Sequence, residues 1–295
     1  MKNRAMTGIG MVLLAAILWG TTGTAQTLVP AGLPAHWVGA LRLLFSGIFF
    51  FAYLVWEQPG ATLRGQLARA PWHWVLVGGA SMAAYNLTFF AGVKASSVAI
   101  GTAIALGSGP IFAGLLQIAL TRRSPSASWW LGTLLAVAGG CLMVLGSAQQ
   151  LQISMLGVGL CLAAGLSYAV YALVSQKLVA QMPASIVTLS VFACATVIAV
   201  PLAFAASGWP TSSLQGWGVL VYLGVAATGF AYLLFTHALQ RISGSTAVSL
   251  CLMEPLTAFC LAIAVVGERP PAAAFVGLAL VLLGLAVVVR AEMRN

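Results

Sequence analysis

The sequence predicts an all-α integral membrane protein with ten transmembrane helices, built from two inverted five-helix repeats. Composition is the first reason: 61% of the 295 residues are hydrophobic and 6% are charged, whereas about a quarter of the residues of a soluble domain are charged. The second reason is a series of apolar segments, each close to the roughly 20 residues that cross a bilayer. The third reason is that the two halves of the chain resemble each other.

Short connections separate the apolar segments, and the longest of them, 57–71, is too short for a soluble domain. The first segment follows Lys2 and Arg4, as it would in a signal peptide. It is longer than a signal h-region and lacks an A-x-A cleavage site, so it is expected to remain as a helix. The expected spans are 7–29, 36–56, 72–92, 97–120, 127–147, 153–176, 184–206, 215–238, 243–266 and 271–290.

Lys and Arg gather on one side of these spans. With the N-terminus in the cytoplasm, Lys94 and Arg269 are the basic residues of the outer connections, and the cytoplasmic side collects ten. This bias predicts that both termini are cytoplasmic. The net charge of +9 is therefore read as an orientation signal in the lipid bilayer, and nucleic acid is not an expected partner. The ten are Lys2, Arg4, Arg64, Arg69, Arg122, Arg123, Lys177, Arg241, Arg290 and Arg294.

The halves, 1–148 and 149–295, each hold five spans, and this odd number makes the second half enter the membrane from the other side. Inverted repeats of this kind place a substrate site near the bilayer midplane, between the halves, which is typical of transporters. A shift of 149 pairs Trp19, Thr22, Gln26 and Pro34 with Tyr168, Tyr171, Ser175 and Pro183, and a shift of 145 pairs Pro110, Gly132 and Gly139 with Pro255, Gly277 and Gly284.

Polar and aromatic side chains recur on single faces of the spans, about halfway through the bilayer. Trp19, Thr22 and Gln26 are spaced i, i+3 and i+7, which places them on one helix face. We interpret these faces as the wall of a cavity for a small amphipathic or aromatic organic substrate. The alternative is ordinary helix packing, with hydroxyls bonded back to their own helix. The other expected wall residues are Tyr168, Tyr171, Ser175, Ser81, Tyr85, Asn86, Phe89, Thr228, Tyr232 and Phe235.

Two prolines lie near the middle of the fourth and ninth spans, at equivalent positions. Pro110 follows the small residues Gly107, Ser108 and Gly109, and Pro255 follows Glu254. A proline removes one helical hydrogen bond, and helices broken at matching places indicate a transport site. We therefore predict helix breaks at both prolines and count Ser108 among the site residues. The other interpretation is a permanent kink that shapes the bundle.

Two charged side chains lie within the spans. Glu254 is the acid deep in a span, and a carboxylate there must be paired or protonated. It could carry a proton, bind a substrate ammonium, or bond backbone near Pro255. Arg42 lies about two turns into the second span and could anchor helices or bind an anionic substrate group. We favour the anchor for Arg42. Neither charge is repeated, because the equivalent positions are Gly109 and Val191.

Enzyme chemistry and metal binding are not expected. The chain has no Asp, no H-E-x-x-H motif and no phosphate-binding G-x-x-x-x-G-K-[ST] loop, so neither catalytic residues nor a cofactor is predicted. The five Cys residues form no C-x-x-C pair, and the three His residues lie in different segments. Small residues line the fifth and tenth spans and favour close contact, within the bundle or with another protomer, so the oligomeric state stays open. They are Gly132, Ala136, Gly140, Gly277 and Gly284.

Several motifs together resemble the drug/metabolite transporter superfamily, in the branch with two EamA-type repeats, over essentially the whole chain. They are Leu18-Trp19-Gly20, Arg42 after Pro34, Pro110 before Arg122, Glu254-Pro255, Gly267-Glu268-Arg269, and Gly277 with Gly284. One departure is that family repeats often end the fourth span with a Gly-Glu pair, where this chain has Arg122 and Arg123.

The resemblance implies a bacterial inner-membrane exporter of small metabolites that uses no ATP. Within the branch, the aromatic midplane is most similar to YddG-type amino-acid exporters. This similarity implies export of neutral or aromatic amino acids by alternating access, with proton coupling as an open question. Export of cationic drugs or of sugar derivatives is the alternative.

Overall fold

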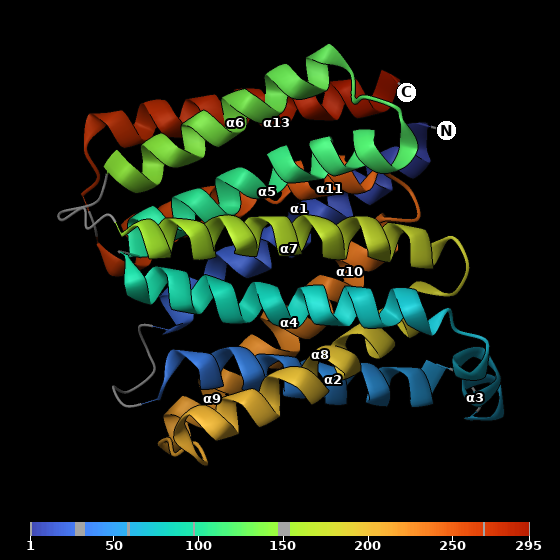
Figure 1. Ribbon diagram of the computed structural model, residues 1–295. Helices are drawn as coiled ribbons and strands as arrows, with labels where there is room; N and C mark the ends of the chain where they lie inside the picture. Colours follow the sequence, from blue (N-terminus) through green and yellow to red (C-terminus); the bar gives the residue numbers. More distant parts are fainter. Residues whose placement is uncertain are drawn as a thin grey trace.

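The computed structural model confirms an all-helical membrane protein (Figure 1). Within the part of the chain that the structure describes, ten helical segments are long and apolar enough to cross a bilayer, in the order predicted. Both termini lie at the same end of the bundle (Figure 1, right), here called the terminal end; the other is the opposite end. The structure describes residues 2–26, 33–57, 60–96, 98–146, 154–267 and 269–294, so the predicted span ends at 27–29, 97, 147 and 153 lie outside the described residues.

The first repeat contains six helices, one more than predicted. The extra helix, α3 (Gly60–Ala68), lies in the connection that was expected to be a loop. It forms because the apolar residues Leu63 and Leu67, spaced i and i+4, pack against the core. The spans of this repeat are α1 (Lys2–Gln26), α2 (Ala35–Glu57), α4 (Trp72–Ala95), α5 (Val98–Thr121) and α6 (Ala127–Gly146).

In the second repeat, two of the five spans are divided. The eighth span consists of α9 (Leu214–Gly224), the π-helical turn η1 (Val225–Phe230) and α10 (Ala231–Ala238). The ninth consists of α11 (Gly244–Leu250), α12 (Met253–Leu261) and η2 (Ala262–Val266). The remaining spans are α7 (Met155–Val179), α8 (Ala184–Ser207) and α13 (Ala272–Arg294).

The two prolines have different effects. The ninth span is interrupted at Cys251–Leu252. Pro255 has no amide hydrogen to donate to the Cys251 carbonyl, and this carbonyl instead accepts from the Glu254 amide at 2.8 Å. The predicted break at Pro110 is wrong, because α5 continues through it. α5 also packs closely on α7 one turn before this proline, because a Cβ on Gly165 of α7 would lie 2.9 Å from the Ala105 carbonyl.

The first helix of each repeat packs mainly against the other repeat. α1 lies against α10 and α12, and α7 lies along α4 and α5 (Figure 1). The second and fifth spans instead pair with their own counterparts, α2 with α8 and α6 with α13. Two helix groups result, α1 with the eighth and ninth spans and α7 with the third and fourth spans.

The small-residue stripes of the fifth and tenth spans meet inside this chain. A Cβ on Gly139 would lie 2.6 Å from the Gly277 carbonyl, and a Cβ on Gly277 would lie 2.6 Å from the Gly139 carbonyl. Gly132 and Gly284 are in the same kind of contact, since a Cβ on Gly132 would lie 2.8 Å from the Gly284 carbonyl. Because Gly132 and Gly139 are the counterparts of Gly277 and Gly284, the contacts are exchanged by an approximate twofold axis.

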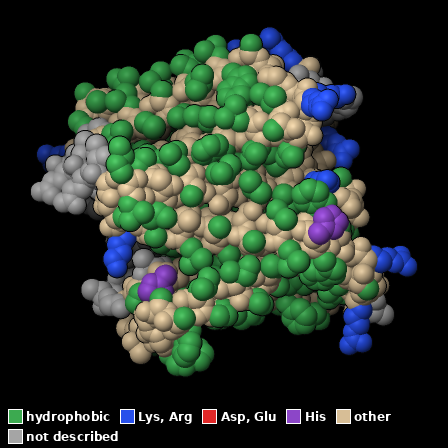
Figure 2. Space-filling model, viewed as in Figure 1, with side chains coloured by type: hydrophobic (Ala, Val, Ile, Leu, Met, Phe, Trp, Pro, Cys, Tyr) green, Lys and Arg blue, Asp and Glu red, His purple; other side chains and the backbone are tan. Residues whose placement is uncertain are grey.

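The surface suits a lipid environment. Figure 2 shows hydrophobic side chains spread over the length of the helices, with Lys and Arg side chains at the two ends. Large apolar side chains such as Ile48, Phe51 and Leu282 are exposed. Trp56 and Trp209, near the two ends, are also exposed, as is typical of aromatic residues at membrane interfaces.

Candidate functional site

An aromatic cluster occupies the middle of the bundle, between the two helix groups. It joins α1, α4, α7, α8 and α10 through successive ring contacts. Its members, called the aromatic cluster below, are Trp19, Tyr85, Phe89, Tyr168, Tyr171, Phe192, Tyr232 and Phe235.

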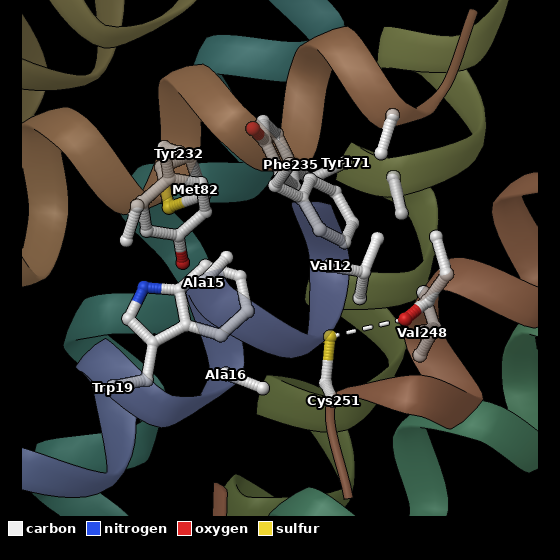
Figure 3. Packing of buried hydrophobic residues seen from close by; sticks show 14 of the residues in the cluster. Val12, Ala15, Ala16, Trp19, Met82, Tyr171, Tyr232, Phe235, Val248 and Cys251 are labelled. Atoms are coloured by element: carbon white, nitrogen blue, oxygen red, sulfur yellow. Dashed lines mark hydrogen bonds between the residues drawn. The ribbon is translucent and has the colours of Figure 1, made fainter. Parts of the chain in front are cut away.

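Repeat-related residues meet in this cluster. The rings of Trp19 and Tyr168 lie edge to face with centroids 6.4 Å apart. Trp19 also packs on Tyr232 at 4.8 Å and on Phe235 at 5.7 Å, and Figure 3 shows these rings turned toward one another. On the far side of the group, the Cys251 thiol donates to the Ala247 carbonyl at 3.1 Å (Figure 3). The cluster thus lies where counterparts of the two repeats come together.

The sequence pattern predicts most members of the cluster but not Phe192. Phe192 is fully buried in α8 and contacts Tyr232 at 4.8 Å. Its immediate neighbours in the chain, Val191 and Ala193, are apolar, and the hydroxyls of Thr188 and Thr196 on the same face bond back to their own helix. Phe235, three residues after Tyr232, follows the expected spacing.

Burial divides the cluster into a packed part and a more accessible part. Tyr171 is 1% exposed and Ser175 is 0% exposed, so in this conformation both lie in the core. Tyr85, Phe89 and Tyr168 are half-buried. The accessible part of the cluster therefore lies on α4 and on the face of α7 that meets it.

Two polar atoms of α1 have no hydrogen-bond partner in the cluster. They are the buried Nε1 of Trp19 and the buried Oγ1 of Thr22. A buried donor without a partner is unfavourable by about 1–3 kcal/mol, so such groups mark places where a ligand or water completes the bonding. The Oγ of Ser175 is unpaired in the same way.

Other expected polar residues bond to their own helices. The Asn86 amide nitrogen donates to the Met82 carbonyl at 3.0 Å, and the Ser108 hydroxyl donates to the Ala105 carbonyl at 3.4 Å. This is the packing arrangement that the sequence left open as an alternative. The acceptor oxygen of Asn86 points toward α2, because a Cβ on Gly39 would lie 3.4 Å from it. Ser81 is half-buried on α4, one turn before Tyr85, and the side chain of Gln26 lies outside the described residues.

Arg42 connects α2 to the π-helical turn of the eighth span. Its Nε donates to the Thr228 hydroxyl at 3.0 Å, and that hydroxyl donates to the Leu223 carbonyl at 2.7 Å, five residues earlier. π-Helical turns are often found at functional sites. The guanidinium is half-buried, and its Nη atoms have no partner among the described residues.

Glu254 lies in the first turn of α12, next to α1. A Cβ on Gly20 would lie 2.7 Å from the Glu254 carbonyl, which shows how closely the two helices approach. The carboxylate is half-buried and interacts electrostatically with Arg42, but it forms no hydrogen bond with any described residue. Arg42 reaches Thr228, one turn before Tyr232, and Glu254 packs on Gly20, next to Trp19, so the base and the acid lie beside the same cluster.

The terminal end of the site is closed by a polar network around the start of α11. Glu292 of α13 accepts from the Ser243 amide at 2.9 Å, the Ser243 hydroxyl at 3.0 Å and the Thr246 hydroxyl at 2.6 Å. Gln176 of α7 accepts from the Gly244 amide at 3.0 Å, and Gln117 of α5 accepts from the Ser245 hydroxyl at 2.5 Å. The Gln176 and Gln117 bonds link the two helix groups at this end, and the Glu292 bonds tie the start of α11 to α13.

A groove of about 470 Å³ opens at the opposite end, between α1, α9 and α12. Thr21 and Tyr222 line it and share a hydrogen bond of 2.7 Å between their hydroxyls. None of the residues expected to line the cavity borders this groove. Among the residues that the structure describes, no three His, Cys, Asp or Glu side chains are grouped as metal ligands.

Two consecutive matches to the EamA-like transporter family cover residues 6–145 and 155–290, one for each repeat. The chain belongs to the EamA-like transporter family. The family matches coincide with the two five-helix units of the fold, so this EamA protein is a multi-pass membrane transporter with two repeats.

Proteins of known sequence resemble this EamA transporter over most of its length. It is 37% identical over 279 residues to "Uncharacterized transporter YwfM" of Bacillus subtilis (strain 168), covering 94% of this chain and 92% of that protein. It is 29% identical over 266 residues to "Threonine/homoserine exporter RhtA" of Salmonella typhimurium (strain SL1344), covering 88% and 83%. It is 24% identical over 283 residues to a "Probable terminal-alkyne amino-acid exporter" of Streptantibioticus cattleyicolor, covering 95% and 92%.

A crystal structure has the same fold as this EamA transporter. The two superpose with a TM-score of 0.83 over 98% of each chain, at 20% sequence identity. At this identity the likeness concerns the arrangement of the ten spans.

Proposed function

We propose that this EamA transporter exports amino acids with neutral or aromatic side chains across the bacterial inner membrane by alternating access. The observation that carries the proposal is the aromatic cluster at the meeting point of the two repeats, bordered by Arg42 and Glu254. Aromatic rings suit the apolar part of such a substrate, and charged groups suit its ionised backbone. Two relatives are named as amino-acid exporters, which supports the same substrate class.

The two helix groups supply the moving parts of this mechanism. They are joined by the Gln176 and Gln117 bonds at the terminal end, which the excess of Lys and Arg indicates to be cytoplasmic. Rocking of one group against the other would break these bonds and open the cluster to the cytoplasm. The repeats 1–148 and 149–295 then act as the structural halves, and no catalytic step is required.

Export of cationic compounds is the second candidate. Glu254 and the aromatic rings would both attract a cation. Arg42 argues against it, because a guanidinium facing the same cluster repels a purely cationic substrate. Sugar derivatives without charge would leave both ionic groups unused.

Counterflow in proteoliposomes tests the proposal. Vesicles containing purified protein are loaded with one unlabelled amino acid, and uptake of the labelled amino acid is measured. We expect neutral or aromatic amino acids inside the vesicles to drive this uptake, and we expect added cationic drugs not to inhibit it. Folded protein that exchanges no amino acid would refute the proposal, and uptake of labelled cations would favour the second candidate.

A further inference from the structure

Opposite charges border the aromatic cluster without neutralising each other. Arg42 on α2 holds Thr228, one turn before Tyr232, and Glu254 on α12 packs on Gly20, next to Trp19, whose ring contacts Tyr232 at 4.8 Å. No hydrogen bond joins the two charged side chains among the described residues. Both lie within membrane spans and are half-buried. Charged groups in such a place are unfavourable unless they are paired, so a ligand group of opposite charge would stabilise each of them.

The side-chain atoms of Arg42 and Glu254 that form no hydrogen bond define which chemical groups a ligand must offer. Arg42 uses Nε for Thr228, which leaves the paired Nη donors available. A guanidinium presents such donors in a geometry that matches a carboxylate. The Glu254 carboxylate has no hydrogen-bond donor among the described residues, and an ammonium group would supply up to three. The unpaired Trp19 Nε1, next to the Gly20 contact with Glu254, is a further donor at this site.

We infer that the site recognises the zwitterionic backbone of a free α-amino acid, with the α-carboxylate on Arg42, the α-ammonium on Glu254 and the side chain against the aromatic cluster. This inference rests on the proposed function and specifies which chemical groups of the substrate are required. An amino acid blocked at either end would leave one buried charge unpaired, and the site would reject it strongly for that reason.

The repeats make this recognition directional. The counterpart of Arg42 is Val191 and the counterpart of Glu254 is Gly109, so each charge occurs once in an otherwise repeated frame. The positive group comes from the first repeat and the negative group from the second. A bound amino acid therefore has a single orientation relative to the two helix groups.

Competition by blocked analogues tests the inference. Counterflow of a labelled neutral amino acid is measured with three competitors: the free amino acid, its carboxamide and its N-acetyl derivative. In wild-type protein, we expect each blocked form to compete at least about tenfold less well than the free form. Arg42→Gln should abolish the preference over the carboxamide alone, and Glu254→Gln should abolish the preference over the N-acetyl form alone.

Two kinds of control variant accompany this test: variants that keep the charge at each position, and variants that remove a charge outside the cluster. Arg42→Lys and Glu254→Asp should keep both preferences with weaker exchange. Arg64→Gln in α3 and Glu57→Gln at the terminal end of α2 remove charges outside the cluster and should change neither preference. Monodisperse elution in detergent and an unchanged melting temperature show that a variant is folded. If a glutamine variant does not fold, the wild-type competition decides.

The outcomes separate the inference from the proposed function. Exchange of amino acids with equal competition by the blocked forms would overturn the inference and leave the proposed function standing. Retained rejection of the N-acetyl form in folded Glu254→Gln would also overturn it, and would assign Glu254 to proton transfer if gradient-driven accumulation were lost. Absence of exchange with every amino acid would overturn both.

Discussion

The indole of Trp19 contacts the phenol of Tyr168 edge to face, at a centroid distance of 6.4 Å, and the two residues occupy equivalent positions in the two repeats. Counterparts that touch each other lie on the approximate twofold axis of the molecule. Any movement of one helix group relative to the other must change this contact. In the proposed mechanism, this ring pair would couple substrate binding to the motion of the repeats.

Replacing Trp19 by Phe tests whether its unpaired N–H serves the substrate. The ring contacts with Tyr232 and Phe235 are largely kept, while a buried unpaired donor is removed. We expect the melting temperature to stay the same or rise, and counterflow to fall about three- to tenfold, as for loss of one hydrogen bond. Normal counterflow would show that the indole nitrogen has no part in binding. Trp129→Phe is the matched control, because its buried Nε1 is also unpaired but lies on α6.

Glu292→Gln should loosen the closed terminal end. The amide has one acceptor oxygen in place of two, so it cannot accept from the Ser243 amide and from the Ser243 and Thr246 hydroxyls together as the carboxylate does. We expect the Ser243 amide to exchange hydrogen about tenfold faster, which corresponds to roughly 1.4 kcal/mol. Hydrogen–deuterium exchange of a peptide spanning 239–250 measures this. Equal acceleration in Glu57→Gln would show that the effect is general and not due to this network.

The Gly139 contact with Gly277 should tolerate no side chain. Gly139→Val places a Cβ 2.6 Å from a backbone oxygen, which the rigid α13 cannot move away from. We expect destabilisation of about 1–3 kcal/mol or more, seen as a lower melting temperature in detergent. Gly159→Val on α7 is the control, because a Cβ there meets nothing within 4 Å. An unchanged melting temperature for Gly139→Val would contradict the close packing of α6 and α13.

The two prolines should differ in transport. Pro255→Ala supplies the amide that could bond to the Cys251 carbonyl and join α11 to α12. We expect counterflow to fall by about tenfold, since the break would be lost. Pro110→Ala, in the continuous α5, should stay within about twofold of wild type. Rates that change in the reverse order would show that the first-repeat proline carries the movement. The comparison is made at equal amounts of folded protein.

Periodicity and composition were sufficient to predict the ten spans and the convergence of Trp19, Tyr85 and Tyr168. These features depend on local rules: apolar length and the spacing of residues on one helix face. The sequence did not show that Pro110 leaves α5 intact, because this depends on the packing of α7 against it. It also did not reveal Phe192, whose place in the cluster depends on how α8 meets α10.

The position of Arg42 relative to Glu254 likewise could not be predicted from the sequence. The sequence favoured a structural anchor, and the guanidinium does hold Thr228. Its position opposite Glu254 depends on the contact of α2 with η1 and of α1 with α12, which link segments about two hundred residues apart in the sequence. No spacing rule on one helix could bring these two charges together.

The first helix of each repeat packs in the other repeat, which determines whether one repeat can be stable without the other. α1 finds its neighbours in the second repeat and α7 finds its neighbours in the first. A single five-helix unit, expressed alone, would present an unfilled position where the partner's leading helix belongs. A second copy inserted upside down would fill that position, so we expect a separated half to be stable only as part of such an antiparallel dimer.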